Sequence, residues 1–238
     1  MKLIADIHTH SLASGHAYST IREMAYQAEK QGLELLGVSD HAPKMPGTCH
    51  EFYFYNLKSV DRRMCGIDLM MGAELNIISQ DGRIDLPEHI LQTLDYTIAS
   101  LHTPCLTPGS RKENTYTLRA VMENPYVRII GHPDDARYPV DMREVVQAAI
   151  HTGTILELNN ASLSANGARK NARPIDEEML RLCIEYGQPI LVSSDAHIDS
   201  AVGCCDQALE LLYAFSFPEE LVINADRSRL DLFLQKKL

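Results

Sequence analysis

The chain has 238 residues, 45% hydrophobic and 23% charged, a balance typical of a globular protein with ample material for one large core. Its formal net charge of −10 argues against broad electrostatic capture of nucleic acid or of an anionic membrane. The six cysteines show no zinc-finger or CxxC spacing. With no visible signal peptide and no apolar stretch of about 20 residues, we expect a cytoplasmic protein with reduced thiols.

The first half of the chain alternates expected strands and helices. We expect strands at residues 3–8, 35–39, 68–73 and 96–100, and helices at about 20–31, 53–64 and 87–94. Ser19 is the expected N-cap of the first helix, and Gly32 its stop. Residues 76–85 contain an Asp-Gly turn signal, which predicts a small hairpin.

The second half continues the same alternation. We expect strands at residues 127–130, 155–158 and 189–192, a short extended piece at 221–224, and helices at 115–123, 142–152, 175–186, 204–215 and from about 228 onward. Two polar segments, residues 103–113 and 159–173, are expected to be loops. Because βα units in series form a parallel sheet with right-handed crossovers, the expected class is α/β, with one domain over residues 1–238.

Seven of the ten histidines and two acidic residues lie near the ends of apolar runs. Alone, each would more often be a surface or hydrogen-bonded side chain than a ligand, so their joint placement carries the prediction. The candidate ligands of a polynuclear metal site are His8, His10, His16, His41, Glu74, His102, His132, Asp195 and His197. The remaining His50, His89 and His151 are expected at the surface.

Two acidic residues are expected to support these ligands. Residues 6–10 read Asp-x-His-x-His, and side chains two apart on a strand point the same way. We therefore expect Asp6 to orient a ligand imidazole, and Asp40 to act as a cap or as a partner of a ligand. Ligands at the ends of six expected strands fit the mouth of a closed barrel rather than the crevice of an open sheet, which favours a distorted, TIM-barrel-like (β/α)7 barrel.

The ordered motifs of the chain resemble those of a known family. They are His8-x-His10, Ser39-Asp40-His41, Gly72-Ala73-Glu74, Leu101-His102, Gly131-His132-Pro133 and Ser194-Asp195-Ala196-His197. Together they resemble the polymerase-and-histidinol-phosphatase (PHP) superfamily of metallo-phosphoesterases, from residue 4 to about residue 230. Residues 14–20 and 157–160 look most like the bacterial YcdX-type phosphatases.

This resemblance implies a PHP fold, the distorted (β/α)7 barrel, with three divalent transition-metal ions, usually zinc and sometimes manganese or iron. One ion would be held by His8 and His10 with Glu74 and Asp195. Glu74 would bridge to a second ion bound by His102 and His132. The third would be held by His16, His41 and His197. The resemblance also implies a homo-oligomer, a trimer.

The ligand types suit hydrolysis of a phosphate monoester, which its own negative charge protects from nucleophiles. Seven neutral imidazoles and only two carboxylates leave a cluster of cations strongly positive. Nitrogen ligands favour zinc, manganese or iron over magnesium or calcium. No Ser-His-Asp or Cys-x5-Arg nucleophile pattern is evident, so we expect a metal-bound hydroxide to attack, with Glu74 as the bridging carboxylate.

Basic side chains in the two long polar loops are candidates for binding a small phosphorylated substrate. They are Arg111, Lys112, Arg169, Lys170 and Arg173, with Arg169 favoured because its loop follows the sixth strand directly. Each alone would more often be a solvated surface charge. Basic groups on the rim of an acidic protein would nevertheless focus an anion toward the metals.

Three alternatives remain open from the sequence. A phosphodiesterase or 3′ exonuclease of the same superfamily is disfavoured by the acidic charge and the lack of an aromatic-basic stripe. Amidohydrolase-type C–N hydrolysis would typically add a carbamylated Lys at a strand end, which is not found. A metal-stabilised, non-catalytic partner-binding module is disfavoured by the complete ligand set.

Overall fold

The computed structural model describes residues 1–165 and 167–235. Its parallel strands run in chain order: β1 (Ala5–Asp6), β2 (Leu35–Val38), β4 (Ile67–Met71), β5 (Ala73–Asn76), β6 (Thr97–Ser100), β7 (Ile129–Ile130), β8 (Ile155–Asn159) and β9 (Ile190–Ser193). The short β3 (Arg63–Met64) pairs antiparallel with β4. Strands at all seven expected positions are therefore confirmed.

These strands form two sheets, and single β-bridges join the sheets into a distorted barrel. One sheet has the order β1-β2-β4-β3 and the other β5-β6-β7-β8-β9. Parallel bridges link His41 to Glu74, and Thr9 to Ala196. The expected third strand is thus split at Gly72 into β4 and β5, which belong to different sheets. This break and the bridged closure are the distortion of the (β/α)7 barrel.

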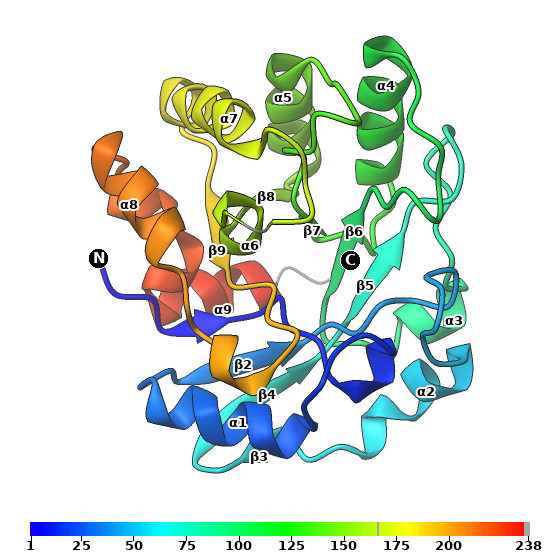
Figure 1. Cartoon of the computed structure of the whole chain (residues 1–238), viewed down its shortest axis with the longest axis vertical. Coiled ribbons are helices and arrows are strands. Elements are labelled where there is room, and N and C mark those ends of the chain that lie inside the picture. Colours follow the sequence, from blue (N-terminus) through cyan, green and yellow to red (C-terminus); the bar gives the residue numbers. More distant parts are fainter. Residues whose placement is uncertain (166, 236–238) are drawn as a thin grey trace.

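Helices cover the outside of the strands, as Figure 1 shows. They are α1 (Ile21–Lys30), α2 (Glu51–Asn56), α3 (Glu88–Leu91), α4 (Arg111–Met122), α5 (Met142–Thr152), α6 (Asn160–Leu163), α7 (Ala172–Tyr186), α8 (Asp206–Ala214) and α9 (Arg227–Gln235). Among the described residues, no helix is both long enough and apolar enough to span a bilayer.

Helix starts follow the capping chemistry, and this corrects two predictions. The first helix is capped by Thr20, in a capping box with Glu23, and not by Ser19. A second capping box, between Ser110 and Glu113, begins α4 at the end of the segment expected to be a loop. Arg111 therefore lies in the first turn of a helix.

The expected helix over residues 53–64 is wrong in its second half. α2 ends at Asn56, a 3-10 turn follows, and the chain then enters the hairpin of β3 and β4. Cys65 and Gly66 lie between the paired residues Met64 and Ile67, and both have positive φ, 51° and 87°. Two consecutive left-handed residues match the twist of a tight hairpin, so the local turn overrides the helical pattern.

Other predictions at the ends of elements had mixed outcomes. The hairpin expected at residues 76–85 is confirmed by the antiparallel bridge of Ile77 with Ile84. The extended piece expected at residues 221–224 instead forms 3-10 turns, and Val222 makes a single parallel bridge to Ile190. α7 begins at Ala172, three residues earlier than expected.

An apolar cluster lies beneath the polar end of the barrel. Most of its members come from the strands and from α9, and the full set is Ala5, Ile7, Leu35, Met70, Tyr96, Ile98, Ile129, Ile155, Leu191, Ile223, Leu230 and Phe233. On β8, Glu157 and Asn159 follow Ile155 at intervals of two. Because strand side chains alternate faces, these polar groups share a face with the apolar cluster, one layer further along.

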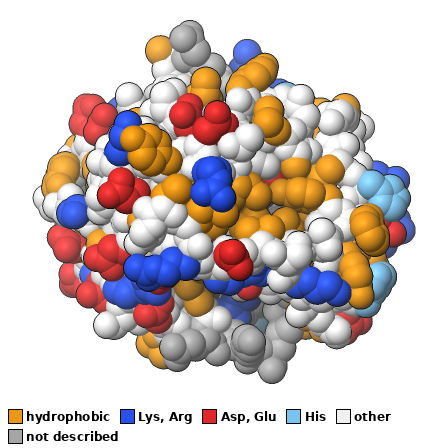
Figure 2. Space-filling view, turned by 90° about the horizontal axis from the view of Figure 1, so that it is seen from below, with side chains coloured by type: hydrophobic (Ala, Val, Ile, Leu, Met, Phe, Trp, Pro, Cys, Tyr) orange, Lys and Arg blue, Asp and Glu red, His pale blue; other side chains and the backbone are white. Residues whose placement is uncertain are grey.

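A different apolar area lies on the surface. Figure 2 shows hydrophobic side chains gathered in the middle of one face, with basic and acidic groups around them. Large exposed hydrophobic side chains of the molecule include Tyr26 of α1 and Phe52 of α2, with exposed fractions of 54% and 67%.

Candidate metal centre

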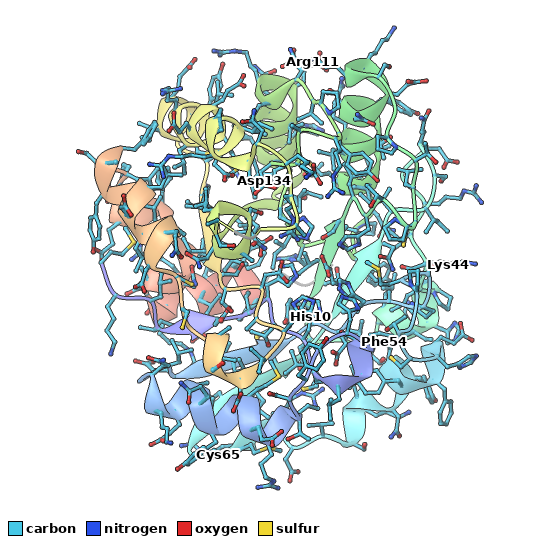
Figure 3. The ribbon with its side chains drawn as sticks, in the orientation of Figure 1. His10, Lys44, Phe54, Cys65, Arg111 and Asp134 are labelled. Atoms are coloured by element: carbon cyan, nitrogen blue, oxygen red, sulfur yellow. The ribbon has the colours of Figure 1, made fainter. Side chains whose placement is uncertain are left out.

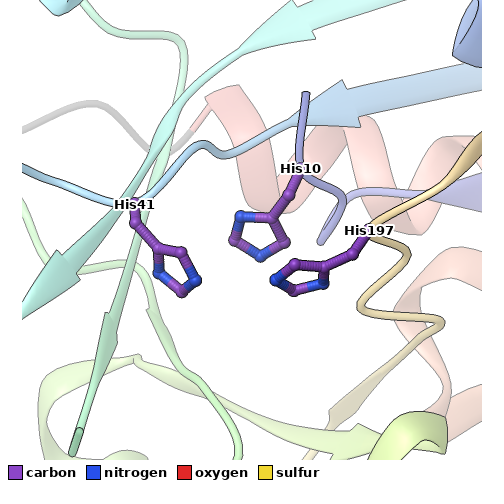
Figure 4. Close-up of side chains that lie close together, drawn as sticks. All are labelled: His10, His41 and His197. Carbon is purple, nitrogen blue, oxygen red and sulfur yellow. The ribbon is translucent and has the colours of Figure 1, made fainter. Parts of the chain in front are cut away.

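Seven of the nine candidate ligands follow the carboxyl ends of strands. His8 and His10 follow β1, His41 follows β2, Glu74 is in β5, His102 follows β6, His132 follows β7, and Asp195 and His197 follow β9. His16 precedes α1. In Figure 4 the rings of His10, His41 and His197 converge on one space although they come from distant parts of the chain.

Glu74 lies at the centre of this group, and imidazoles surround its fully buried carboxylate. The nitrogen-to-oxygen distances at Oε1 are 2.8 Å from His132, 3.2 Å from His102 and 3.5 Å from His8, and those at Oε2 are 2.6 Å from His41 and 3.6 Å from His10. Imidazoles therefore face both oxygens of this carboxylate.

Asp195 is the second carboxylate of the cluster. Its Oδ1 lies 3.2 Å from Nε2 of His10, 3.6 Å from Nε2 of His8 and 3.7 Å from Nδ1 of His197. Its Oδ2 accepts a hydrogen bond from Nη2 of Arg169 at 2.9 Å. One oxygen therefore faces the imidazoles while the other is held by a cation.

Four overlapping triads place one ligand atom of each member within 4.8 Å of the others. They are His10 with His41 and His197, His8 with His132 and Asp195, His8 with His10 and Glu74, and His41 with Glu74 and His102. His16 stacks beside the first triad, with ring centroids 4.8 Å from His41 and 5.0 Å from His197. All nine candidates thus lie in one cluster.

Several atoms at the centre fit metal ligation on chemical grounds. Nε2 of His8, Nε2 of His10 and Oε2 of Glu74 are buried and make no hydrogen bond to a described group. A buried polar atom left without a partner costs about 1–3 kcal/mol. Bound cations would satisfy these converging atoms, so the residues present fit a metal centre.

Hydrogen bonds at the opposite ring nitrogens orient the imidazoles. Nδ1 of His8 is 2.6 Å from Oε1 of Glu157, and Nδ1 of His102 is 2.8 Å from Oδ1 of Asn76. Nδ1 of His197 is 2.9 Å from the carbonyl oxygen of Asp195. Because each partner is an acceptor, Nδ1 carries the proton, and the lone pair of Nε2 is left for a metal.

Asp40 acts on the ligands through a serine. It accepts hydrogen bonds from the hydroxyls of Ser11, Ser14 and Tyr53, each at 2.7 Å. Since Ser14 donates its only proton to Asp40, its oxygen must accept from Nδ1 of His10, 3.1 Å away. The same oxygen accepts from the backbone N–H of His41. Asp40 therefore supports two ligands indirectly.

Asp6 does not orient a ring in the way the sequence predicts. Its carboxylate accepts hydrogen bonds from the backbone and hydroxyl of Ser194 and from the backbone N–H of Gly203. It thus holds the segment that carries Asp195. The carboxylate that orients His8 through Nδ1 is Glu157, to which the sequence assigned no role. Its position after Ile155 in a buried strand was the available signal.

Electrostatics keep both central carboxylates ionised. Burial by itself raises the pKa of Glu74, but electrostatic interaction with His102, His41 and His8 outweighs it and holds that pKa well below its usual value. Burial also raises the pKa of Asp195, and His8 and Arg169 likewise hold it well below its usual range. The centre is therefore built for anionic carboxylates beside cations.

Two candidate ligands have left-handed backbone conformations. His132 has φ 50° and Asp195 has φ 55°, and each is the second residue after the end of its strand, β7 and β9 respectively. A non-glycine residue in this region costs about 1 kcal/mol. Such conformations cluster at functional sites, where the surrounding structure imposes them. Here they turn the two side chains into the cluster at the point where the strand ends.

The five basic candidates are not brought together. Arg169 alone reaches the cluster, through Asp195 and, at 3.5 Å, Oδ1 of Asn159. Arg111 and Lys112 are exposed in the first turn of α4, and in Figure 3 Arg111 is at the edge of the molecule, away from His10. Arg173 pairs with Glu177 at 3.4 Å on α7, and Lys170 is exposed.

A barrel whose strand ends present clustered imidazoles and carboxylates defines a class of metal-binding α/β proteins. Within that class, residues 6–187 match the model of the PHP domain family, and the chain belongs to this family.

Its relatives include a probable phosphatase of Clostridium novyi (strain NT), 43% identical over 237 residues, covering 100% of this chain and 96% of the relative. A probable phosphatase of Caldanaerobacter subterraneus is also 43% identical, over 238 residues, covering 100% of this chain and 93% of the relative.

A solved structure shares the fold. The crystal structure of histidinol phosphate phosphatase from Lactococcus lactis, in complex with zinc, L-histidinol and phosphate, superposes with a TM-score of 0.65. The two sequences are 17% identical, and the match covers 92% of this chain and 95% of the other. At this identity the likeness shows the fold alone.

Proposed function

We propose that this protein is a metal-dependent phosphatase that hydrolyses phosphate monoesters of small molecules at a centre of three divalent transition-metal ions. The observation that carries the proposal is the cluster around Glu74, in which several buried imidazole nitrogens and Oε2 of Glu74 converge without hydrogen-bond partners among the described residues. The names of its relatives, probable phosphatases at 43% identity over the whole chain, support the same class of reaction.

The proposed ligands divide among three ions. His8 and His10 would hold the first with Glu74 and Asp195, and Glu74 would bridge to a second held by His102 and His132. His16, His41 and His197 would hold the third. Mostly nitrogen donors suit zinc best, with manganese or iron as alternatives. Ions held there lower the pKa of a bound water, neutralise phosphoryl oxygens and stabilise the departing alkoxide.

The chain itself supplies orientation and charge. Glu157, Ser14 and Asn76 fix the proton of three imidazoles on Nδ1 and so aim Nε2 inward. Arg169 holds Oδ2 of Asp195, which leaves Oδ1 for the metal side. A guanidinium has five N–H donors, and the described contacts with Asp195 and Asn159 use two. The others can grip the phosphate of the substrate.

Turnover of two chromogenic esters tests this function. Protein loaded with zinc should hydrolyse p-nitrophenyl phosphate at least tenfold faster, in kcat/KM, than bis(p-nitrophenyl) phosphate. Preference for the diester would favour the phosphodiesterase alternative. No turnover of either ester by protein that retains its metals would favour the non-catalytic partner-binding module.

A further inference from the structure

Two loops at the mouth of the barrel are fastened together on both sides of Arg169. One is the segment after β7, which carries His132 and continues through Asp135 and Arg137. The other runs between α6 and α7 and carries Arg169. Their connection matters because Arg169 is the basic candidate that reaches the metal cluster.

Three hydrogen bonds join the backbone around Arg169 to the first loop. The N–H of Ala136 donates to the carbonyl of Lys170 at 2.9 Å, and the N–H of Lys170 donates to Oδ1 of Asp135 at 3.3 Å. On the other side, Nη2 of Arg137 donates to the carbonyl of Ala168 at 3.1 Å. The residues immediately before and after Arg169 are therefore both held.

The two side chains of this connection also hold each other. Nε of Arg137 lies 2.8 Å from Oδ2 and 3.0 Å from Oδ1 of Asp135, and the backbone N–H of Arg137 donates to the same Oδ1 at 3.0 Å. Asp135 is buried, and these bonds hold its pKa below the usual value although burial raises it. The carboxylate stays charged, which strengthens each of its hydrogen bonds.

Arg169 needs such support because its own position is demanding. Its side chain is 14% exposed, so the guanidinium is largely out of water and depends on its bond to Asp195. A long, flexible side chain loses up to about 2 kcal/mol of rotamer freedom when fixed. A mobile backbone would raise that cost. Gly167 also lies tightly against α6, where a Cβ would come within 2.7 Å of the carbonyl oxygen of Ala161.

We infer that Asp135 and Arg137 are positioning residues, which fix the backbone of residues 168–170 so that Arg169 reaches Asp195 and the substrate phosphate. The part of the inference that concerns the substrate phosphate rests on the proposed function, whereas the contact between the two loops does not. The contact also connects Arg169 to the strand end that carries His132, because the segment that holds the backbone around Arg169 follows β7. Neither Asp135 nor Arg137 touches the reacting atoms.

The test uses Asp135→Asn and Arg137→Ala in the zinc-loaded full chain, with Arg169→Ala as the reference. Each should weaken binding of inorganic phosphate, measured by calorimetry, about tenfold, and should raise KM for p-nitrophenyl phosphate more than it lowers kcat. Metal content should stay at the parent value. Arg143→Ala is the matched control, because Arg143 pairs with Glu185 at 3.0 Å on the surface. This variant should change neither the affinity for phosphate nor KM.

A double-mutant cycle separates positioning from general destabilisation. If Asp135 acts through Arg169, then Asp135→Asn should cause no further loss of phosphate affinity in the Arg169→Ala protein. The inference would be overturned if the double variant lost phosphate affinity by the product of the two single losses, or if both single variants, Asp135→Asn and Arg137→Ala, kept the parent's affinity.

Hydrogen exchange tests the loop contact even if the parent proves not to be a phosphatase. Amides 167–170 should exchange faster in Asp135→Asn than in the parent, and unchanged exchange would refute the contact.

Discussion

Glu74 is the residue on which the centre depends most. Its carboxylate is fully buried, five imidazoles approach its two oxygens, and its pKa is held well below the usual value because the neighbouring histidines outweigh the effect of burial. A single buried negative charge shared by so many donors fixes the spacing of the cations that would surround it.

Glu74→Gln should lower turnover by orders of magnitude and release at least one ion per chain. The amide keeps the shape of the side chain but removes the charge that two ions would share, and its NH2 group cannot ligate a cation. Elemental analysis and p-nitrophenyl phosphate kinetics measure both effects, with circular dichroism to confirm that the fold is kept. Glu29→Gln, on the exposed side of α1, is the matched control. Turnover within a few-fold of the parent would rule out the bridging role.

At the scale of the elements, the strands and the ligand positions could be predicted because both follow from simple periodicity. Apolar runs end where a polar side chain is needed, and parallel strands in a barrel bring such ends together. This reasoning was enough to place His102 and His132, which are 30 residues apart in sequence, at the same end of the barrel, whereas their shared neighbour Glu74 was implied by the family resemblance.

Features that depend on tertiary contacts could not be predicted in this way. The hairpin at Cys65 and Gly66 replaces a helical pattern because two left-handed residues join β3 to β4. The sequence shows that Glu157 is in a strand, but only the fold shows that it meets His8. The position of Arg169 after the sixth strand favoured it among the five basic candidates, but only the fold shows that it meets Asp195.

Gly72 marks the break between β4 and β5, and it gives a prediction about the fold. A Cβ there would lie 2.6 Å from Cε1 of Tyr96 and 2.8 Å from the carbonyl oxygen of the same residue. Gly72→Ala should therefore lower the free energy of unfolding by about 1–3 kcal/mol, the usual cost of overpacking. Urea unfolding measures the change.

The control is Gly109→Ala, where the nearest atom to the new methyl group would be the flexible end of Gln80, at 2.8 Å. It should cost less than Gly72→Ala. Equal stability of the Gly72 variant and the parent would show that the barrel yields at this break without strain.

Most acidic side chains of this protein, whose net charge is −10, can ionise freely in water, but a few carboxylates are buried and are costly to ionise. Asp176 and Asp134 are buried, and their carboxylate oxygens make no hydrogen bond to a described group. Burial raises the pKa of Asp176 well above its ordinary value, and Asp134 and Glu157 raise it further. In the view of Figure 3, Asp134 lies between His10 and the helices α5 and α7.

Asp176→Asn should make stability less dependent on pH. Because the folded state binds this proton more tightly than the unfolded state, stability falls as pH rises from the ordinary pKa of 3.8 toward the raised one. The substitution removes that fall, which amounts to about 1.4 kcal/mol for each unit of the shift. Unfolding of variant and parent at pH 5 and pH 8 measures it. If the free energies of unfolding of variant and parent differed by the same amount at both pH values, the raised pKa of Asp176 would be contradicted.

The most direct measurement for the whole account is a zinc titration of chelator-stripped protein, with turnover of p-nitrophenyl phosphate and bound metal followed together. We expect no turnover without metal, and a rise in turnover that is complete when about three ions are bound per chain, as nine ligands with one bridging carboxylate require. Full activity in the metal-free protein, saturation at one ion per chain, or no activity with all sites filled would contradict the account.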